Sequence, residues 1–133
     1  MAVMPSFRDA ATAKDVVALE AMLADDVVFI SPVAHKPYPG KHVTAEILRA
    51  VSEVLEQLTY VRELVDGAHH AYMFTAKVDG LDLTGCDFLT FENDKIVELM
   101  VMVRPLKAAQ ALAAKMGERY PAIQAAVMAR MRA

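Results

Sequence analysis

The sequence predicts an α+β domain in which a strongly curved antiparallel sheet wraps around N-terminal helices, with further helices at the C-terminus. Apolar residues recur with a helical period of about 3.6 in the first part of the chain and with the two-residue period of strands after residue 58. Asp66-Gly67 and Asp79-Gly80 then mark tight turns, which are typical of antiparallel neighbours. A bent sheet closed by helices forms a cone, so we expect an apolar cavity for a small ligand inside it.

Size and composition fit one globular domain. The chain has 133 residues, long enough for a substantial core, and we expect residues 1–133 to form a single domain. Within it, residues from about 5–105 would form the core fold and 106–133 a C-terminal helical extension. Hydrophobic residues make up 56% of the chain, which excludes a disordered protein.

The same composition disfavours several classes of partner. A net charge of −3 gives no reason to expect nucleic acid or an acidic membrane surface. No apolar run reaches the roughly 18 residues of a membrane span, and Met1–Arg8 does not resemble a signal peptide. The one cysteine fits a reducing cytoplasm, and the four histidines lack zinc-site spacing. We therefore expect a cytoplasmic protein without metal, cofactor, nucleic-acid partner or membrane anchor.

The N-terminal part of the chain predicts helix followed by strand. Residues 6–23 carry apolar side chains at three- and four-residue spacings, with a break near residues 12–14. Asp15 is suited to cap a second helix after that break. Residues 27–31 are mostly β-branched or aromatic and predict a short strand, which ends at Pro32.

A loop and a third helix follow. Residues 32–40 hold three prolines and a glycine, which predicts an irregular loop that also carries His35 and Tyr38. Thr44 is predicted to cap the next helix. The buried stripe of that helix would consist of Ile47, Leu48, Val51, Val54, Leu55 and Leu58.

The second half predicts a meander of strands and then helix. We expect strands over residues 59–65, 70–77, 81–91 and 96–104. Pro105 would end the last strand. Gly117 and Pro121 then divide the remaining sequence, which predicts two short helices rather than one. Their packing residues would be Leu106, Leu112, Met116, Ile123, Val127 and Met131.

Asp87 breaks the apolar pattern of its strand and is the main functional candidate. It stands between Cys86 and Phe88, where a buried carboxylate is costly unless it is hydrogen-bonded or protonated. No Lys or Arg lies close in sequence, so we predict a raised pKa for Asp87 inside an apolar pocket. Such a group can donate a proton near neutral pH. The alternative is a structural carboxylate that accepts hydrogen bonds and does no chemistry.

Four stretches are distinctive: residues 13–15, 23–32, 38–40 and 85–103, the last with an aspartate near its start and Asp-Lys-Ile-Val at its turn. They resemble the nuclear transport factor 2-like superfamily, which includes ketosteroid isomerase and the SnoaL-like polyketide cyclases. The resemblance covers roughly residues 5–105. It implies the cone-shaped α+β fold described above.

Residue by residue, the resemblance implies a site different from that of ketosteroid isomerase. Asp87 matches the strand aspartate of that enzyme, and it also matches the acid/base aspartate of the SnoaL-like cyclases. Ser31 stands where the isomerase has its general base, and Phe7 where it has a phenol donor. Serine cannot abstract a carbon-bound proton without a base of its own, and phenylalanine has no donor. We therefore do not expect a steroid isomerase.

The resemblance also implies which residues surround the cavity. From their chemistry, His35, His70 or Tyr72 would be the catalytic partner of Asp87. The family's register predicts a substrate-binding set consisting of Phe7, Ser31, Tyr72, Phe74, Leu89, Leu99, Val101 and Val103. Met100 and Met102 would lie on the opposite, outer face of the sheet, where many family members form a homodimer.

Three functional classes stay open at this point. The first is an acid/base enzyme acting on a small, mostly apolar molecule by isomerisation, cyclisation, dehydration or hydrolysis such as epoxide opening. The second is a non-catalytic protein that binds such a molecule, and the third is a dimeric interaction module. A titratable group within hydrogen-bond reach of Asp87 would favour the enzyme, and a filled cavity would favour the interaction module.

Overall fold

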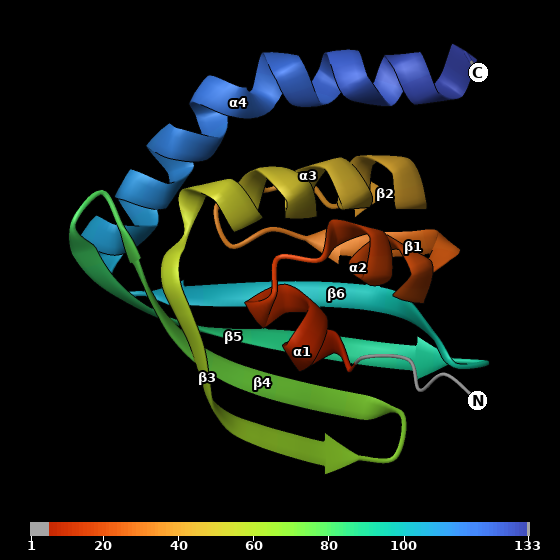
Figure 1. The fold of residues 1–133 in the computed structure, drawn as a ribbon, viewed down its shortest axis with the longest axis horizontal. Coiled ribbons are helices and arrows are strands. Elements are labelled where there is room, and N and C mark those ends of the chain that lie inside the picture. Colours follow the sequence, from red (N-terminus) through yellow and green to blue (C-terminus); the bar gives the residue numbers. More distant parts are fainter. Residues whose placement is uncertain (1–5, 133) are drawn as a thin grey trace.

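The computed structural model describes residues 6–132 and has four helices and six strands in this range (Figure 1). In chain order they are α1 (Phe7–Thr12), α2 (Val16–Met22), β1 (Leu23–Ile30), β2 (Tyr38–Pro39), α3 (Lys41–Val54), β3 (Glu56–Asp66), β4 (His69–Val78), β5 (Leu81–Glu92), β6 (Lys95–Arg104) and α4 (Leu106–Arg132). The predicted α+β class is confirmed.

All six strands belong to one curved sheet with the order β2-β1-β6-β5-β4-β3. Strands β3 to β6 form the predicted antiparallel meander, while β1 pairs with β6 in the parallel sense. Figure 1 shows the helices gathered on one side of this sheet, with α3 between the sheet and the second half of α4. The sheet therefore has one face toward the helices and one face without helices.

Cross-strand pairing places Asp87 on the inner face. Asp87 of β5 stands opposite Tyr72 of β4 and Val101 of β6. Its same-face neighbour Leu89 is fully buried, whereas Phe88 on the other face is 37% exposed. Because successive residues of a strand alternate between faces, the inward orientation predicted for Asp87 and Leu89 agrees with their burial.

The first half of the sheet differs from the prediction in two places. Strand β1 begins at Leu23, four residues before the predicted start, because Leu23 is itself buried in the core. The loop that was predicted to be irregular contains β2, which pairs with β1. Gly40, with a left-handed φ of 103°, caps α3 instead of Thr44. The hydroxyl of Thr44 donates to the carbonyl oxygen of Gly40 at 2.8 Å within the first turn.

The prediction of two short C-terminal helices is wrong, because α4 runs unbroken from Leu106 to Arg132. Proline removes one backbone donor and bends a helix without necessarily ending it, and Figure 1 shows such a bend partway along α4. Leu106 and Met131 are each 72% exposed, so they do not pack as predicted. Leu112 and Ile123, on either side of Pro121, are buried and hold both halves against the core.

Ion pairs join α4 to the helices beneath it. Arg130 donates from Nη2 to Oε1 of Glu20 at 2.8 Å and from Nε to Oε2 of Glu46 at 2.7 Å. Arg119 pairs with Glu53. Glu20 belongs to α2 and the other two acids belong to α3. These ion pairs therefore hold the second half of α4 against α2 and α3.

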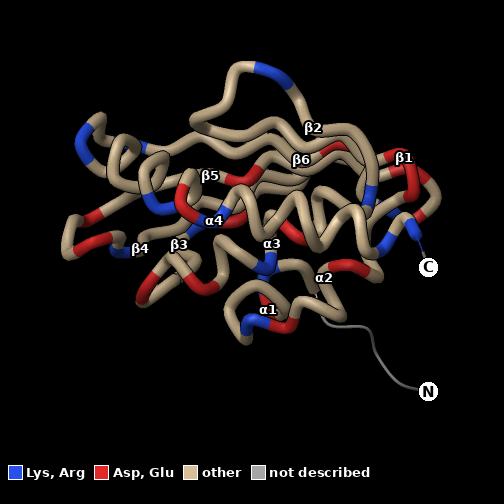
Figure 2. The backbone as a smooth tube through the Cα atoms, turned by 90° about the horizontal axis from the view of Figure 1, so that it is seen from above, with Lys and Arg blue, Asp and Glu red and all other residues tan. Residues whose placement is uncertain are grey.

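Charged residues of both signs are spread along the backbone (Figure 2). Figure 2 shows Lys and Arg interspersed with Asp and Glu, with no large region of a single sign in this view. Within residues 6–132, no helix is long and apolar enough to cross a membrane.

Candidate functional site

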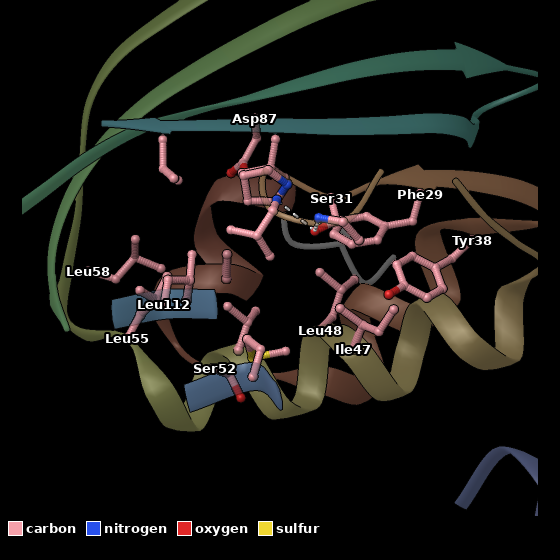
Figure 3. Close-up of a pocket in the computed structure, with 18 of the residues that line it drawn as sticks. Phe29, Ser31, Tyr38, Ile47, Leu48, Ser52, Leu55, Leu58, Asp87 and Leu112 are labelled. Atoms are coloured by element: carbon pink, nitrogen blue, oxygen red, sulfur yellow. Dashed lines mark hydrogen bonds between the residues drawn. The ribbon is translucent and has the colours of Figure 1, made fainter. Parts of the chain in front are cut away.

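A cavity of about 440 Å³ lies between the inner face of the sheet and the helices (Figure 3). This volume is within the roughly 300–1,000 Å³ of typical small-molecule pockets. Each of the four helices and six strands contributes at least one residue to its walls, and so does the loop after β1. Most of the lining is aliphatic or aromatic and includes Phe29, Ile47, Leu48, Leu55, Leu58 and Leu112.

Two charged residues, Asp87 and Lys14, line this apolar cavity. The other polar groups of the lining are hydroxyls, carried by Ser31, Ser52, Tyr38, Tyr60 and Tyr120. An apolar ligand with one or two polar atoms matches such a lining better than a highly charged one, because a buried charge on the ligand would have few partners.

Asp87 is buried and hydrogen-bonded to a phenol. Its side chain lines the cavity although the residue is only 7% exposed. The hydroxyl of Tyr60 donates to Oδ2 of Asp87 at 2.7 Å. Burial raises the pKa of Asp87 from 3.8 to about 7, while the hydrogen bond from Tyr60 acts in the opposite direction. Desolvation dominates because the ionised form loses its hydration and gains a single neutral donor.

The same environment keeps Tyr60 protonated. Burial, followed by the nearby Asp87 carboxyl, raises the pKa of the Tyr60 phenol above its ordinary value. The Asp87–Tyr60 pair therefore changes its protonation near neutral pH through the carboxyl group and not through the phenol.

Local sheet geometry brings the two groups together. A register irregularity of β3 lies beside Tyr60, and bulges of this kind re-aim side chains. The ring of Phe74 packs edge-on against Tyr60, with centroids 5.8 Å apart. Phe74 has room for this position because its cross-strand partner is Gly85, where an added Cβ would lie 2.4 Å from Cζ of Phe74.

Ser31 follows β1 directly and turns the chain at the cavity wall. Its Oγ accepts hydrogen bonds from the backbone N–H groups of Val33 and Ala34, each at 3.1 Å. Figure 3 shows Ser31 and Asp87 among the side chains that surround the same open space. The turn thus fixes the serine hydroxyl in the pocket that also holds the carboxyl group.

The structure brings six of the predicted site residues to this cavity. These are Phe7, Ser31, Phe74, Asp87, Val101 and Val103. Tyr72, Leu89 and Leu99 are buried on the same inner face but do not line the cavity.

The two histidines predicted as partners of Asp87 lie elsewhere. His35 is exposed in the loop after β1 and is outside the lining of the cavity. His70 lies in a separate hollow beside Phe91, with Nδ1 2.7 Å from the hydroxyl of Tyr72. The residue that does reach Asp87 is Tyr60, which the sequence reasoning did not identify. Lys14, Tyr38, Ser52 and Tyr120 were also missed as lining residues. Over the part of the chain that the structure describes, no three His, Cys, Asp or Glu side chains cluster as metal ligands would.

The chain is similar to one protein-family model and to several solved structures. The family model described as SnoaL-like domain matches residues 6–99. A crystal structure named as a steroid delta-isomerase from Pseudomonas aeruginosa is 39% identical, covers 87% of each chain and superposes with a TM-score of 0.81. An uncharacterized protein with a cystatin-like fold from Silicibacter pomeroyi is 31% identical, with 84% of this chain and 80% of that chain covered and a TM-score of 0.81.

A more distant structure supports the fold alone. It is an NTF2-like protein of unknown function from Mesorhizobium loti, 19% identical, with a TM-score of 0.67 over 74% of this chain and 85% of that chain. The search of curated proteins finds no match.

Proposed function

Since the chain belongs to the SnoaL-like domain family, we propose that its cavity binds a small, mostly apolar molecule on which Asp87 performs an acid/base step. The reaction class is isomerisation, cyclisation, dehydration or hydrolysis. The observation that carries the proposal is a buried carboxyl group in an apolar cavity, to which the hydroxyl of Tyr60 donates a hydrogen bond at 2.7 Å.

The protonation of Asp87 suits such a step. With a pKa of about 7, both the acid and the carboxylate are populated near neutral pH. The carboxylate can take a proton from a bound molecule, and the resulting acid can return it at another atom. Tyr60 is a positioning residue in this scheme, because its hydrogen bond to Oδ2 orients the carboxyl group and counteracts part of the rise in pKa.

Steroid isomerisation is the activity in the name of the Pseudomonas aeruginosa structure, and we do not propose it for this chain. Of the three positions that the resemblance to ketosteroid isomerase assigns to catalysis, the chain keeps Asp87. It has Ser31 and Phe7 at the other two, and both line the cavity. Neither side chain supplies a base, so the proton transfer we propose depends on Asp87 alone.

We also propose that a second copy of the chain covers the outer face of the sheet. Met102 is 54% exposed there, and its cross-strand partner on β5 is Cys86; Phe88 pairs in the same way with Met100. A contiguous apolar face of this kind is suited to an interface between identical subunits.

We propose a cytoplasmic location, which the single cysteine supports because a reducing compartment disfavours disulfides.

The ligand-binding part of the proposal is tested with phenylnaphthylamine, a neutral apolar dye whose fluorescence rises in apolar pockets. We expect saturable binding, and native mass spectrometry of freshly purified protein should detect a retained small molecule. Absence of both would overturn the proposal of a ligand cavity.

The catalytic part is tested with the molecule identified by mass spectrometry. Incubated in deuterium oxide with the wild-type protein, it should be converted or should gain deuterium on carbon, and Asp87→Asn should abolish this while binding persists. If the molecule binds but neither changes nor exchanges, the protein is a non-catalytic binding protein, which is the alternative function.

A further inference from the structure

We infer that Ser31 donates its hydroxyl hydrogen to an acceptor oxygen of the ligand, so that the cavity selects apolar molecules with a carbonyl or similar oxygen in their interior. The inference rests on the proposed function, since it requires a ligand in the cavity. It assigns a specificity-determining role to a residue that cannot serve as a base.

The hydrogen-bond valence of Ser31 supports this role. A hydroxyl oxygen has two lone pairs and one hydrogen. Both lone pairs of Ser31 Oγ are occupied by the N–H groups of Val33 and Ala34. Among residues 6–132, its O–H group donates no hydrogen bond to another residue. Ser31 can therefore only donate, and its remaining hydrogen is available to a molecule in the cavity that it lines.

Two other hydroxyls of the lining differ in this respect. Ser52 donates to the carbonyl oxygen of Arg49 at 2.6 Å, and Tyr60 donates to Asp87 at 2.7 Å. Their hydrogens are already used inside the protein. Tyr38 and Tyr120 lie next to each other in the lining, with ring centroids 6.5 Å apart. Tyr120 is 38% exposed, so water competes with a ligand for hydrogen bonds to its phenol.

The location of Ser31 makes its donor effective. It is half-buried at the end of β1, and the turn over residues 31–34 fixes the direction of its oxygen. A hydrogen bond is stronger in a pocket lined mainly by apolar side chains than in water, and an unpaired donor there is costly. A ligand that supplies an acceptor oxygen thus gains affinity, whereas a hydrocarbon of the same shape leaves the donor unpaired.

The test uses two competitors of equal shape that displace phenylnaphthylamine. Acetylnaphthalene carries a carbonyl oxygen, and isopropenylnaphthalene has a methylene group in its place. We expect the wild-type protein to prefer the ketone by roughly three- to tenfold. Ser31→Ala should reduce this preference, because the cavity loses one of its donors. Ser6→Ala is the matched control and should retain it, because Ser6 caps α1 and lies outside the lining of the cavity.

Two further substitutions separate the donor from the turn. Asparagine at position 31 can accept from the loop N–H groups and still donate, so Ser31→Asn should keep the preference for the ketone. Aspartate accepts but does not donate when ionised, so Ser31→Asp should reduce the preference as Ser31→Ala does, although the turn is preserved.

The outcomes distinguish this inference from the proposed function. If the wild-type protein binds no dye, the ligand cavity itself is refuted and the Ser31 inference with it. If the dye binds but the ketone preference is unchanged in Ser31→Ala and Ser31→Asp, only the inference about Ser31 is refuted. An equal loss of preference in Ser6→Ala would also refute it.

Discussion

Replacing Asp87 with asparagine should change how the stability of the protein depends on pH. The amide has nearly the shape of a protonated carboxyl group and can still accept the hydrogen bond from Tyr60. It cannot ionise, however. The variant therefore keeps the fold while removing the cost of placing a carboxylate in the cavity wall.

The sign and size of the effect follow from the raised pKa of Asp87. Below the unfolded pKa of 3.8, the carboxyl group is protonated in both states and contributes no pH dependence. As pH rises from there to the folded pKa of about 7, the unfolded state ionises first, so the wild-type protein loses stability. The pKa difference is about 3 units at 1.36 kcal/mol each, which gives a penalty on the order of 4 kcal/mol that becomes constant above the folded pKa.

Urea unfolding of both proteins, followed by circular dichroism from about pH 4 to pH 8, measures this penalty. The two proteins should be similarly stable at the acid end, and Asp87→Asn should be more stable by several kcal/mol at the alkaline end. Asp82→Asn is the control, since Asp82 lies on the same strand but its side chain is 88% exposed and pairs with Lys77 at the surface. A wild-type protein that gains stability relative to Asp87→Asn as pH rises would refute the reasoning, because its carboxyl group would then have a lowered pKa.

Four further predictions concern single contacts. Tyr60→Phe removes the hydrogen bond that lowers the pKa of Asp87, so this pKa should increase. In the same urea series, the loss of stability with pH should then continue to higher pH. Gly85→Ala should lower the free energy of unfolding by about 1–3 kcal/mol, since its Cβ meets the Phe74 ring at 2.4 Å; an unchanged urea midpoint would show that the ring moves freely. Arg130→Gln should cost roughly 1–2 kcal/mol by releasing α4 from Glu20 and Glu46, whereas the exposed Arg132→Gln should cost almost nothing. Met102→Glu should dissociate the proposed dimer in sedimentation experiments, and a wild-type protein that sediments as a 14.6 kDa monomer would contradict that proposal.

Much of the fold could be predicted because its signals are local. The turn residues Asn93 and Asp94 adopt left-handed φ values of 51° and 63°, which their side chains tolerate, so the hairpin from β5 to β6 could be predicted from composition. The unbroken helix α4 could not be predicted in this way. Gly117 and Pro121 are local signals for a break, but the burial of Leu112 and Ile123 on either side outweighs them.

The candidate site was harder to predict because its key contact is not local. Asp87 was identified from its own strand, where it interrupts an apolar pattern. Tyr60 lies 27 residues earlier in the chain and two strands away in the sheet, beside an irregular register that alternation alone does not reveal. The chemistry of imidazole favours His35 and His70 as partners, and only the folded arrangement shows that they lie away from the cavity of Asp87.

The most direct test of the proposed function is an NMR titration of the Asp87 carboxyl carbon in the folded protein, assigned by comparison with Asp87→Asn. The account predicts a midpoint near pH 7, because the apolar cavity disfavours the carboxylate more than the Tyr60 hydrogen bond favours it. A midpoint at or below 3.8, the ordinary value for an aspartate, would contradict it. Asp87 would then be a paired structural carboxylate, and the cavity would be that of a binding protein without acid/base chemistry.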